Sequence, residues 1–425
     1  MAISYSELRD GVAGAAVGIR CRTELQPLGG AGDKVFPPTY APDSDARTKY
    51  ALEERLVPSA DGATSEVVQA VVLDSVASQA NRFELALLEA IRRGDLAMPV
   101  TSVDFAGSGL AGLDKVSDYE APHRIFDSLL RDSYDGENLF RNGAVGRAIT
   151  GAKPRDAAAL YHHSPHTLVF GGWDSTGPRG GHGAKYERAI TSEIVALDIR
   201  QGSRTASRID PVGIEKGAGP LYASANGASW ELDPANAALD DKGKPLFLGA
   251  KEGGKGETGR PSQANHGNVT PTIDKNGGIT ARRITGVTTL SLIQLRRLRF
   301  PASPDGTAFD AQRVDAEVAA RTALAALGLA AAALAFEEGF DLRSRCVLVA
   351  NGPIRFELVK RDGSIVPFDL SSADAVKLAG EGAERAAAAG LPWRSGELLL
   401  RPAERLVELI RRSQDIAAVA EAGAR

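Results

Sequence analysis

Cysteine is scarce in this sequence. Only two cysteines, Cys21 and Cys346, occur among the 425 residues, and neither belongs to a CxxC pair. A disulfide framework and a zinc site are therefore unsupported, because each needs several cysteines at characteristic spacings. So few thiols are typical of a protein kept in a reducing compartment, and we expect the chain to be cytoplasmic.

The distribution of apolar residues along the sequence also matches neither a signal peptide nor a membrane span. The first eleven residues, MAISYSELRDG, contain no apolar signal core. The longest uncharged apolar run covers residues 322–336, which is shorter than the ~20 residues that cross a bilayer. Because alanine dominates that run, the sequence predicts a buried helix and no membrane association.

The familiar patterns of catalysis are absent as well. Neither GxxxxGK[ST] nor GxSxG occurs, and no GxGxxG follows an expected strand. The histidines at 162, 163, 166 and 182 form no HExxH motif, and neither cysteine nor a paired carboxylate accompanies them. We therefore expect no catalytic residue, no metal and no cofactor. The alternative is an enzyme that acts on RNA or on a phosphorylated ligand through the glycine-rich loops, with Lys34, Lys185 and Asp174 as its candidate residues.

Charge is distributed unevenly along the chain. The formal net charge is -4, but residues 178–300 hold 18 Lys/Arg and 12 Asp/Glu, a local balance of +6. A basic middle within an acidic whole favours one surface that binds an anionic partner.

The stretch from 168 to 197 carries the strongest signal. The apolar residues 168–170 read as a buried strand, and a loop rich in glycine and basic residues follows. Its candidate ligand-binding residues are Trp173, Thr176, Lys185 and Arg188. Backbone N–H groups, cations and one aromatic ring suit a ligand made of phosphates and stackable bases. The alternative is a surface loop closed by its tryptophan.

Two further segments carry candidate phosphate contacts. Lys34 lies in the glycine- and proline-rich loop 29–40, which can also be read as a simple turn with a solvated lysine. The pattern from 65 to 93 predicts a helix capped by Ser65. On that helix a polar stripe could donate several hydrogen bonds to successive phosphates, unless it is only a solvated face. The stripe consists of Ser75, Ser78, Gln79, Arg82 and, at its edge, Asn81.

The rest of the chain alternates strands and helices. Residues 202–278 lack a strong period and read as an insertion that contains a hairpin. A β-rich segment, 280–300, follows and includes Arg282 and Arg283, which we expect to be further RNA-binding residues. Helices are expected from 309 to 338, after Ser371 and after Pro402, and residues 186–197 fit a helix or a strand equally well. The alternation with antiparallel pairing predicts an α+β fold with helices on one face of the sheet.

Four motifs together resemble one known family. They are GGAGDKVFPPTY (29–40), VLDSVASQANRFE (72–84), APHRIFDSLLRDS (121–133) and LVFGGWDSTGPRGGHGAKYERAITSEIV (168–195). In this order they resemble the CRISPR-associated RAMP protein of type I-U, now I-G, systems, which is similar to the repeated backbone subunit of Cascade complexes.

The resemblance implies a fold and a role. The fold would be an RRM-like (ferredoxin-like) palm with fingers and a thumb hairpin. Residues 1–200 would form the first part of the palm with the fingers, 201–280 the thumb, and 281–425 the remaining palm and the C-terminal helices. Several copies would polymerise along one CRISPR RNA and present it to target DNA, without cutting. Further partners would be the large subunit, the subunit that binds the 5′ handle, and a recruited helicase-nuclease.

The resemblance also supports particular residues. The stripe at Ser75, Ser78, Gln79, Asn81 and Arg82 matches a helix that contacts guide phosphates in related subunits. The strand and loop that contain Trp173, Thr176, Lys185 and Arg188 lie near the guide in those subunits.

Overall fold

The computed structural model describes residues 2–41, 48–58, 64–177, 183–226, 228–250, 259–274, 276–309 and 312–424. Contacts within the chain divide it into two compact units. The first unit comprises residues 1–109, 113–201 and 278–403, and the second comprises 110–112, 202–277 and 404–425.

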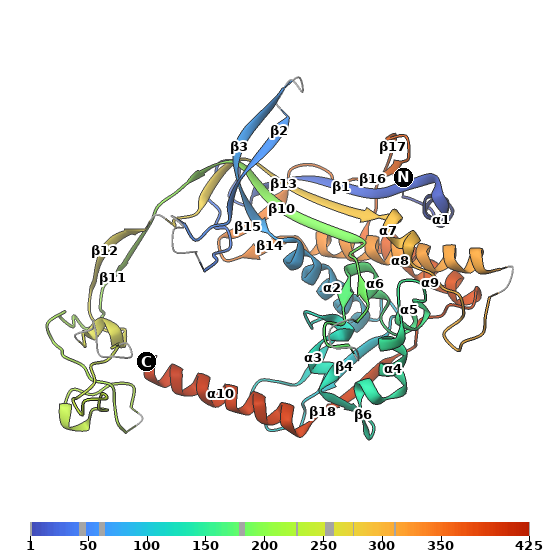
Figure 1. The fold of residues 1–425 in the computed structure, drawn as a ribbon. Helices are drawn as coiled ribbons and strands as arrows, with labels where there is room; N and C mark the ends of the chain where they lie inside the picture. Colours follow the sequence, from blue (N-terminus) through green and yellow to red (C-terminus); the bar gives the residue numbers. More distant parts are fainter. Residues whose placement is uncertain are drawn as a thin grey trace. The chain divides into compact units, whose positions relative to one another are not determined.

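A large antiparallel sheet forms the centre of the first unit. Its strands follow the order β14-β15-β1-β13-β10-β3-β2, and β16 and β17 extend it beside β1 (Figure 1). The long central strands are β1 (Ala16–Pro27), β13 (Ile279–Ser291) and β10 (Ile190–Gln201). The others are β2 (Leu52–Pro58), β3 (Ser65–Asp74), β14 (Phe340–Arg343), β15 (Cys346–Ala350), β16 (Phe356–Lys360) and β17 (Ile365–Phe368).

The alternation of side chains along these strands gives the sheet two different faces. On β1, Cys21, Thr23 and Leu25 are buried, whereas Arg22 and Glu24 between them are exposed. Burial raises the pKa of the thiols of Cys21 and Cys346 to about 11.

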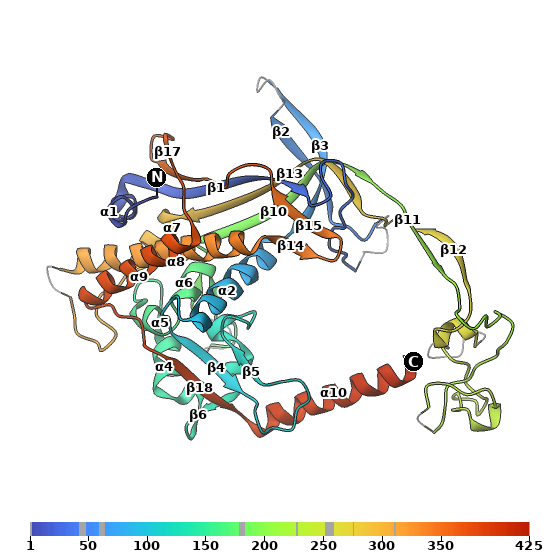
Figure 2. The same ribbon diagram turned by 180° about the vertical axis from the view of Figure 1, so that it is seen from behind.

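Three helices cover the buried face. Helices α2 (Val76–Arg93), α8 (Arg313–Glu338) and α9 (Ser372–Ala388) lie on one side of the sheet in both views (Figures 1 and 2). Helix α8 is apolar and long enough to cross a bilayer, but its apolar window is completely buried within the protein. It packs between α2 and α9, as expected for the central helix of a core.

The β2–β3 hairpin stands on the other side of the sheet. Near its base β3 pairs with β10, from Ala70 to Asp74, and beyond this point the hairpin leaves the sheet. Val68 and Val57 of the hairpin pack with Val195 and Leu197 of β10 in a small apolar cluster. This packing holds the hairpin against the open face, which is the face not covered by α2, α8 and α9.

A second, five-stranded sheet completes the first unit. Its order is β5-β4-β18-β6-β7, and β18 runs parallel to β4 and antiparallel to β6. The strands are β4 (Val100–Asp104), β5 (Lys115–Ser117), β6 (Ser133–Asp135), β7 (Asn138–Leu139) and β18 (Glu397–Pro402). Short helices fill the sequence from 124 to 170: α3 (Ser128–Arg131), α4 (Ala144–Gly151), α5 (Ala158–His163) and α6 (Pro165–Phe170).

The second unit contains the segment inserted between β10 and β13. Strands β11 (Arg204–Arg208) and β12 (Val269–Asp274) form an antiparallel two-stranded sheet. Beyond these two strands, Leu221, Leu248 and Ala264 form a small apolar cluster with Trp230. The glycine- and lysine-rich stretch at 251–256 lies outside the described residues. The unit also contains the final helix, α10 (Glu404–Ala424).

The expected α+β class is confirmed, because helices pack on one face of an antiparallel sheet. Two local expectations were wrong. Ser65 begins strand β3, and the cap of the following helix is Ser75, whose side chain accepts a hydrogen bond from the Ser78 amide. Residues 168–170 end helix α6, although they are buried as expected. The ambiguous segment after 186 contains a strand, β10.

Candidate nucleic-acid interface

A two-stranded ribbon displays an aromatic ring beside a cation. Strands β8 (Gly172–Trp173) and β9 (Lys185–Tyr186) pair so that Trp173 lies directly opposite Lys185. Directly opposed residues of an antiparallel pair point to the same face. Trp173 is 50% exposed and Lys185 is exposed, whereas Tyr186 is buried and stacks with Phe126. Two of the expected binding residues thus form one exposed pair.

The start of this ribbon requires glycine. Gly171 has φ +87°, in the left-handed region. A Cβ on Gly172 would lie 2.7 Å from Cγ2 of Thr167 and 3.1 Å from the Phe126 ring. Helix α6 and the 3₁₀ turn at 124–126 therefore approach the backbone closely at this point.

A buried ion pair fixes the same position. Both oxygens of Glu84 on α2 accept hydrogen bonds from Arg124, each at 2.6 Å, and Arg124 also donates to the Gly171 carbonyl at 3.1 Å. The two side chains are 2% and 7% exposed. Burial raises the pKa of Glu84 to about 7, against the opposing effect of Arg124. Helix α2 thus anchors the first residue of the ribbon.

Two arginines organise the loop that follows Trp173. Arg141 forms an ion pair with Asp174, which is 2% exposed, and also donates to the carbonyl and hydroxyl oxygens of Thr176. Arg131 donates to the same hydroxyl at 3.4 Å. Thr176 was expected from the sequence, but Arg141 was not, because no motif surrounds it. Residues 178–182, with Arg179 and His182, lie outside the described residues.

Arg188 continues the basic surface next to this loop. Its side chain is exposed and begins beside Gly171. Partial burial, together with the charge of Arg124, lowers the pKa of Arg188 below its ordinary value. The guanidinium stays charged at neutral pH, because arginine is not deprotonated in proteins.

The polar stripe of helix α2 binds an internal carboxylate. Asp74 is 1% exposed and accepts hydrogen bonds from Ser78 at 2.8 Å, Gln79 at 2.7 Å and Arg82 at 3.0 Å. Arg82 also donates to the carbonyls of residues 341 and 342. Gln79 is 3% exposed and accepts from Ser192, while Ser75 caps the helix.

Removing the Asp74 charge is expected to destabilise the first unit. Asp74→Asn leaves Gln79 and Arg82 without a charged acceptor, and hydrogen bonds to charged groups contribute about 1.5–3 kcal/mol. We expect a loss of about 1–2 kcal/mol in the free energy of unfolding, measured by urea denaturation. Asp362→Asn, in the exposed turn after β16, is the control and should change stability by less than about 0.5 kcal/mol. Equal stabilities for the two variants would refute the role of Asp74.

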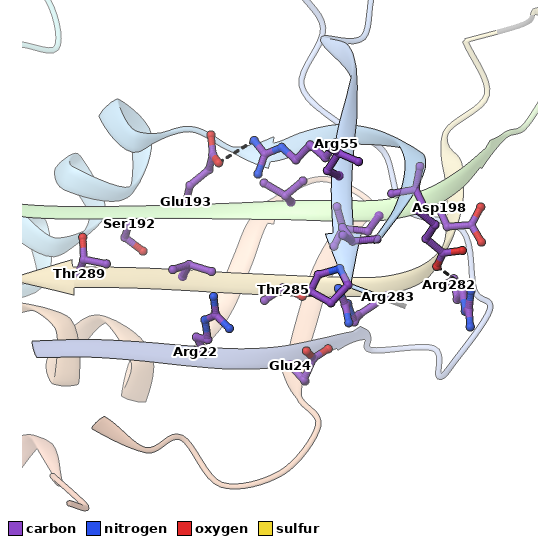
Figure 3. Close-up of a pocket in the computed structure, with 18 of the residues that line it drawn as sticks. Arg22, Glu24, Arg55, Ser192, Glu193, Asp198, Arg282, Arg283, Thr285 and Thr289 are labelled. Atoms are coloured by element: carbon purple, nitrogen blue, oxygen red, sulfur yellow. Dashed lines mark hydrogen bonds and ion pairs between the residues drawn. The ribbon is translucent and has the colours of Figure 1, made fainter. Parts of the chain in front are cut away.

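A groove lies between the hairpin and the open face of the sheet, and we call it the sheet groove (Figure 3). Its volume is about 810 Å³. Two ion pairs cross it: Arg55 of β2 to Glu193 of β10 at 2.9 Å, and Arg282 of β13 to Glu66 of β3 at 3.5 Å. Further charged and hydroxyl side chains of its lining are Arg22, Glu24, Thr191, Ser192, Asp198, Arg283, Thr285 and Thr289.

The expected residues fall into separate groups. Trp173, Thr176, Lys185 and Arg188 gather at the ribbon and its loop. Arg282 and Arg283 line the sheet groove.

Other expected residues lie elsewhere. Ser78, Gln79 and Arg82 donate to Asp74, Ser75 caps helix α2, and Asn81 is exposed on the same helix. Lys34 precedes Val35, which bridges to Ile279 at the start of β13. Arg82 and Lys185 line different cavities. The residues expected in the loop after 170 thus lie together on an exposed surface at the ribbon. The polar side chains expected on helix α2 instead bond mainly to the buried carboxylate of Asp74.

Part of the chain matches a known family. Residues 19–201 match the family model described as CRISPR-associated protein GSU0053. This range covers β1, the hairpin, α2, the ribbon and β10. The chain has no significant match among curated proteins.

Proposed function

We propose, from the family match over residues 19–201, that the chain is a CRISPR-associated, RAMP-type protein and a backbone subunit of a type I, subtype I-G (I-U), Cascade effector. In this proposal several copies assemble along one CRISPR RNA, hold its sugar–phosphate chain and leave its bases free to pair with target DNA. The large subunit, the 5′-handle subunit and a helicase-nuclease are the proposed further partners. The RRM-like palm and a thumb within 201–280 belong to the same proposal.

The observation that carries the RNA-binding role is the exposed pair of Trp173 and Lys185. An aromatic ring can stack on any base, and an adjacent ammonium group can pair with the neighbouring phosphate. Glu84, Arg124 and Arg141 fix the backbone on both sides of the pair, so its position is set before RNA binds. Arg188 adds a second exposed cation.

These contacts carry no base-specific hydrogen bonds. Phosphate contacts fix position, whereas sequence is read at base edges. Stacking on Trp173 likewise tolerates every base. We therefore propose that the subunit binds unrelated spacers with similar affinity, as a guide-holding protein requires.

Replacing Lys185 by alanine should weaken binding and reduce its dependence on salt. For single strands, each neutralised phosphate contributes about −0.7 to the slope of log K against log salt. We expect the slope of Lys185→Ala to be smaller in magnitude by about 0.7, for two unrelated spacers alike, in filter-binding titrations. Lys377→Ala, at an exposed position on α9, is the control and should retain the original slope. A loss confined to one spacer would contradict backbone binding.

We also propose that the subunit binds RNA without cleaving it. The enzyme alternative is motivated by the glycine-rich loops with Lys34 and Lys185. The residue chosen for its test, Asp174, has a carboxylate that is 2% exposed and paired with Arg141. A reacting phosphate could not reach it without breaking this pair. Labelled RNA incubated with the protein, with and without divalent cations, should stay intact. Cleavage that Asp174→Ala abolishes would instead establish the enzyme.

A further inference from the structure

We propose that the sheet groove is the docking site for helix α10 of a second copy of this chain. The inference rests on the proposed assembly of several copies and names the surfaces through which they join. In this proposal the ligand of the groove is a protein helix, although Arg282 and Arg283 were expected from the sequence to bind RNA.

The charges of the groove argue against a polyanion. Four arginines line it, but so do four carboxylates, those of Glu24, Glu66, Glu193 and Asp198. Arg55 and Arg282 are already paired across it with Glu193 and Glu66. A nucleic acid would meet as much repulsion as attraction, whereas a segment with both signs of charge meets complementary partners.

The groove also offers an apolar surface. Val57, Val195 and Val287 line it, and Leu56 of the hairpin is 73% exposed. The occupant should therefore carry aliphatic side chains between its charges.

Helix α10 has this composition. Leu406, Leu409, Ile410 and Ile416 recur at a spacing of three, four and seven residues, which puts them on one face. Leu409 is 66% exposed and Ile416 is 71% exposed, so this face is not covered within its own unit. Residues 404–418 also hold three arginines, at 405, 411 and 412, and three acids, at 404, 408 and 415. The groove and the helix thus both combine aliphatic side chains with equal numbers of positive and negative charges.

The dimensions agree. A helix about 10–12 Å across, with a pitch of about 5.4 Å, encloses roughly 400–600 Å³ per turn. Seated to half its depth, it would fill the groove's 810 Å³ with about three turns. The span from Leu406 to Ile416 is three turns long.

A contact between two different surfaces can also repeat. An interface that joins a helix of one copy to a groove of the next is heterologous, and such interfaces build open filaments when the rotation does not close. This geometry suits copies that follow one another along an RNA, because each copy retains one free helix and one free groove for its neighbours.

Cross-linking between two variants, each with one added exposed cysteine, tests the contact. Full-length Leu56→Cys and Ile416→Cys proteins are mixed on an RNA long enough for several copies and treated with a short bismaleimide. The native thiols do not interfere, because Cys21 and Cys346 are buried. We expect a cross-linked dimer in the mixture, at least fivefold above either variant alone. Ile365→Cys, 44% exposed on β17, replaces Leu56→Cys in the control mixture and should give no such increase.

Two companion measurements separate this inference from the proposed function. Binding of a short RNA that holds one copy reports on RNA binding alone and should be unchanged in Arg283→Glu, whereas cross-linking should fall severalfold in that background. If Arg283→Glu instead weakens binding of the short RNA, the groove holds RNA and the inference is wrong. Native mass spectrometry that finds several copies per RNA, without the cross-link, would also overturn it. If RNA does not bind, the same two variants are cross-linked as concentrated protein without RNA. The dimer is again expected, and its absence would contradict the inference.

Discussion

Replacement of Arg124 by methionine is expected to destabilise the protein by about 3–5 kcal/mol. The substitution leaves the Glu84 carboxylate buried without its bidentate partner, and breaking a buried ion pair on one side costs this much. It also removes the hydrogen bond to the Gly171 carbonyl at the start of the ribbon. The free energy of unfolding, from urea denaturation at neutral pH, measures the loss.

The pH dependence of this variant identifies the cause. Burial raises the pKa of Glu84 in the folded protein to about 7, from an ordinary value of 4.5. An acid with a raised folded pKa binds more protons folded than unfolded, so its contribution to stability falls as pH rises from about 4.5 through 7. Without Arg124 the pKa rises further, and we expect much of the loss to be recovered near pH 5.

A matched pair of substitutions provides the control. The double variant Glu84→Gln, Arg124→Met has no unpaired buried charge and should be more stable than Arg124→Met at neutral pH. If the single and double variants are equally stable, and neither depends on pH between 5 and 7, the buried pair does not hold the ribbon as described.

Replacement of Trp173 by alanine is expected to lower the affinity for RNA roughly 10- to 100-fold. The ring is half exposed on the ribbon, and stacking on an aromatic side chain contributes about 1–3 kcal/mol per base. Because every base has a stacking face, the loss should be similar for pyrimidine-rich and purine-rich oligonucleotides. Fluorescence anisotropy titration at one fixed salt concentration measures it.

Trp173→Phe separates stacking from packing. Phenylalanine retains an aromatic face at the same position, so this variant should keep most of the affinity. Stability should change little in either variant, since the indole is not part of the core. An alanine variant that binds RNA as well as the original protein would remove the ribbon from the binding surface.

Some of the fold follows from local sequence alone. The helix after Ser371, with its cap, was predicted correctly, because both depend on residues next to one another. The long buried helix before residue 338 was likewise evident from its alanine-rich composition. The extended strand β18 was missed, because Leu398–Leu400 is too short an apolar run to distinguish a strand from a helix.

Other features depend on contacts between distant segments. The segment 65–74 is exposed at its start and buried towards its end, and its pairing with β2 and β10 makes it a strand despite the helical spacing that continues from it. The sequence analysis assigned Ser78, Gln79 and Arg82 as donors to phosphates, and in the structure all three donate to Asp74. Their acceptor, Asp74, was visible beside them, but its burial follows from tertiary packing. Arg141 was missed because only the folded loop brings it to Asp174.

The most direct test of the central claim is the number of copies that bind RNAs of different length and sequence. Native mass spectrometry of the protein with RNAs of two lengths, each in two unrelated sequences, gives this number. We predict that the number of copies rises in proportion to length and is the same for both sequences. A single copy at every length, or copies that bind only one of the sequences, would contradict a subunit that assembles along the guide by holding its backbone.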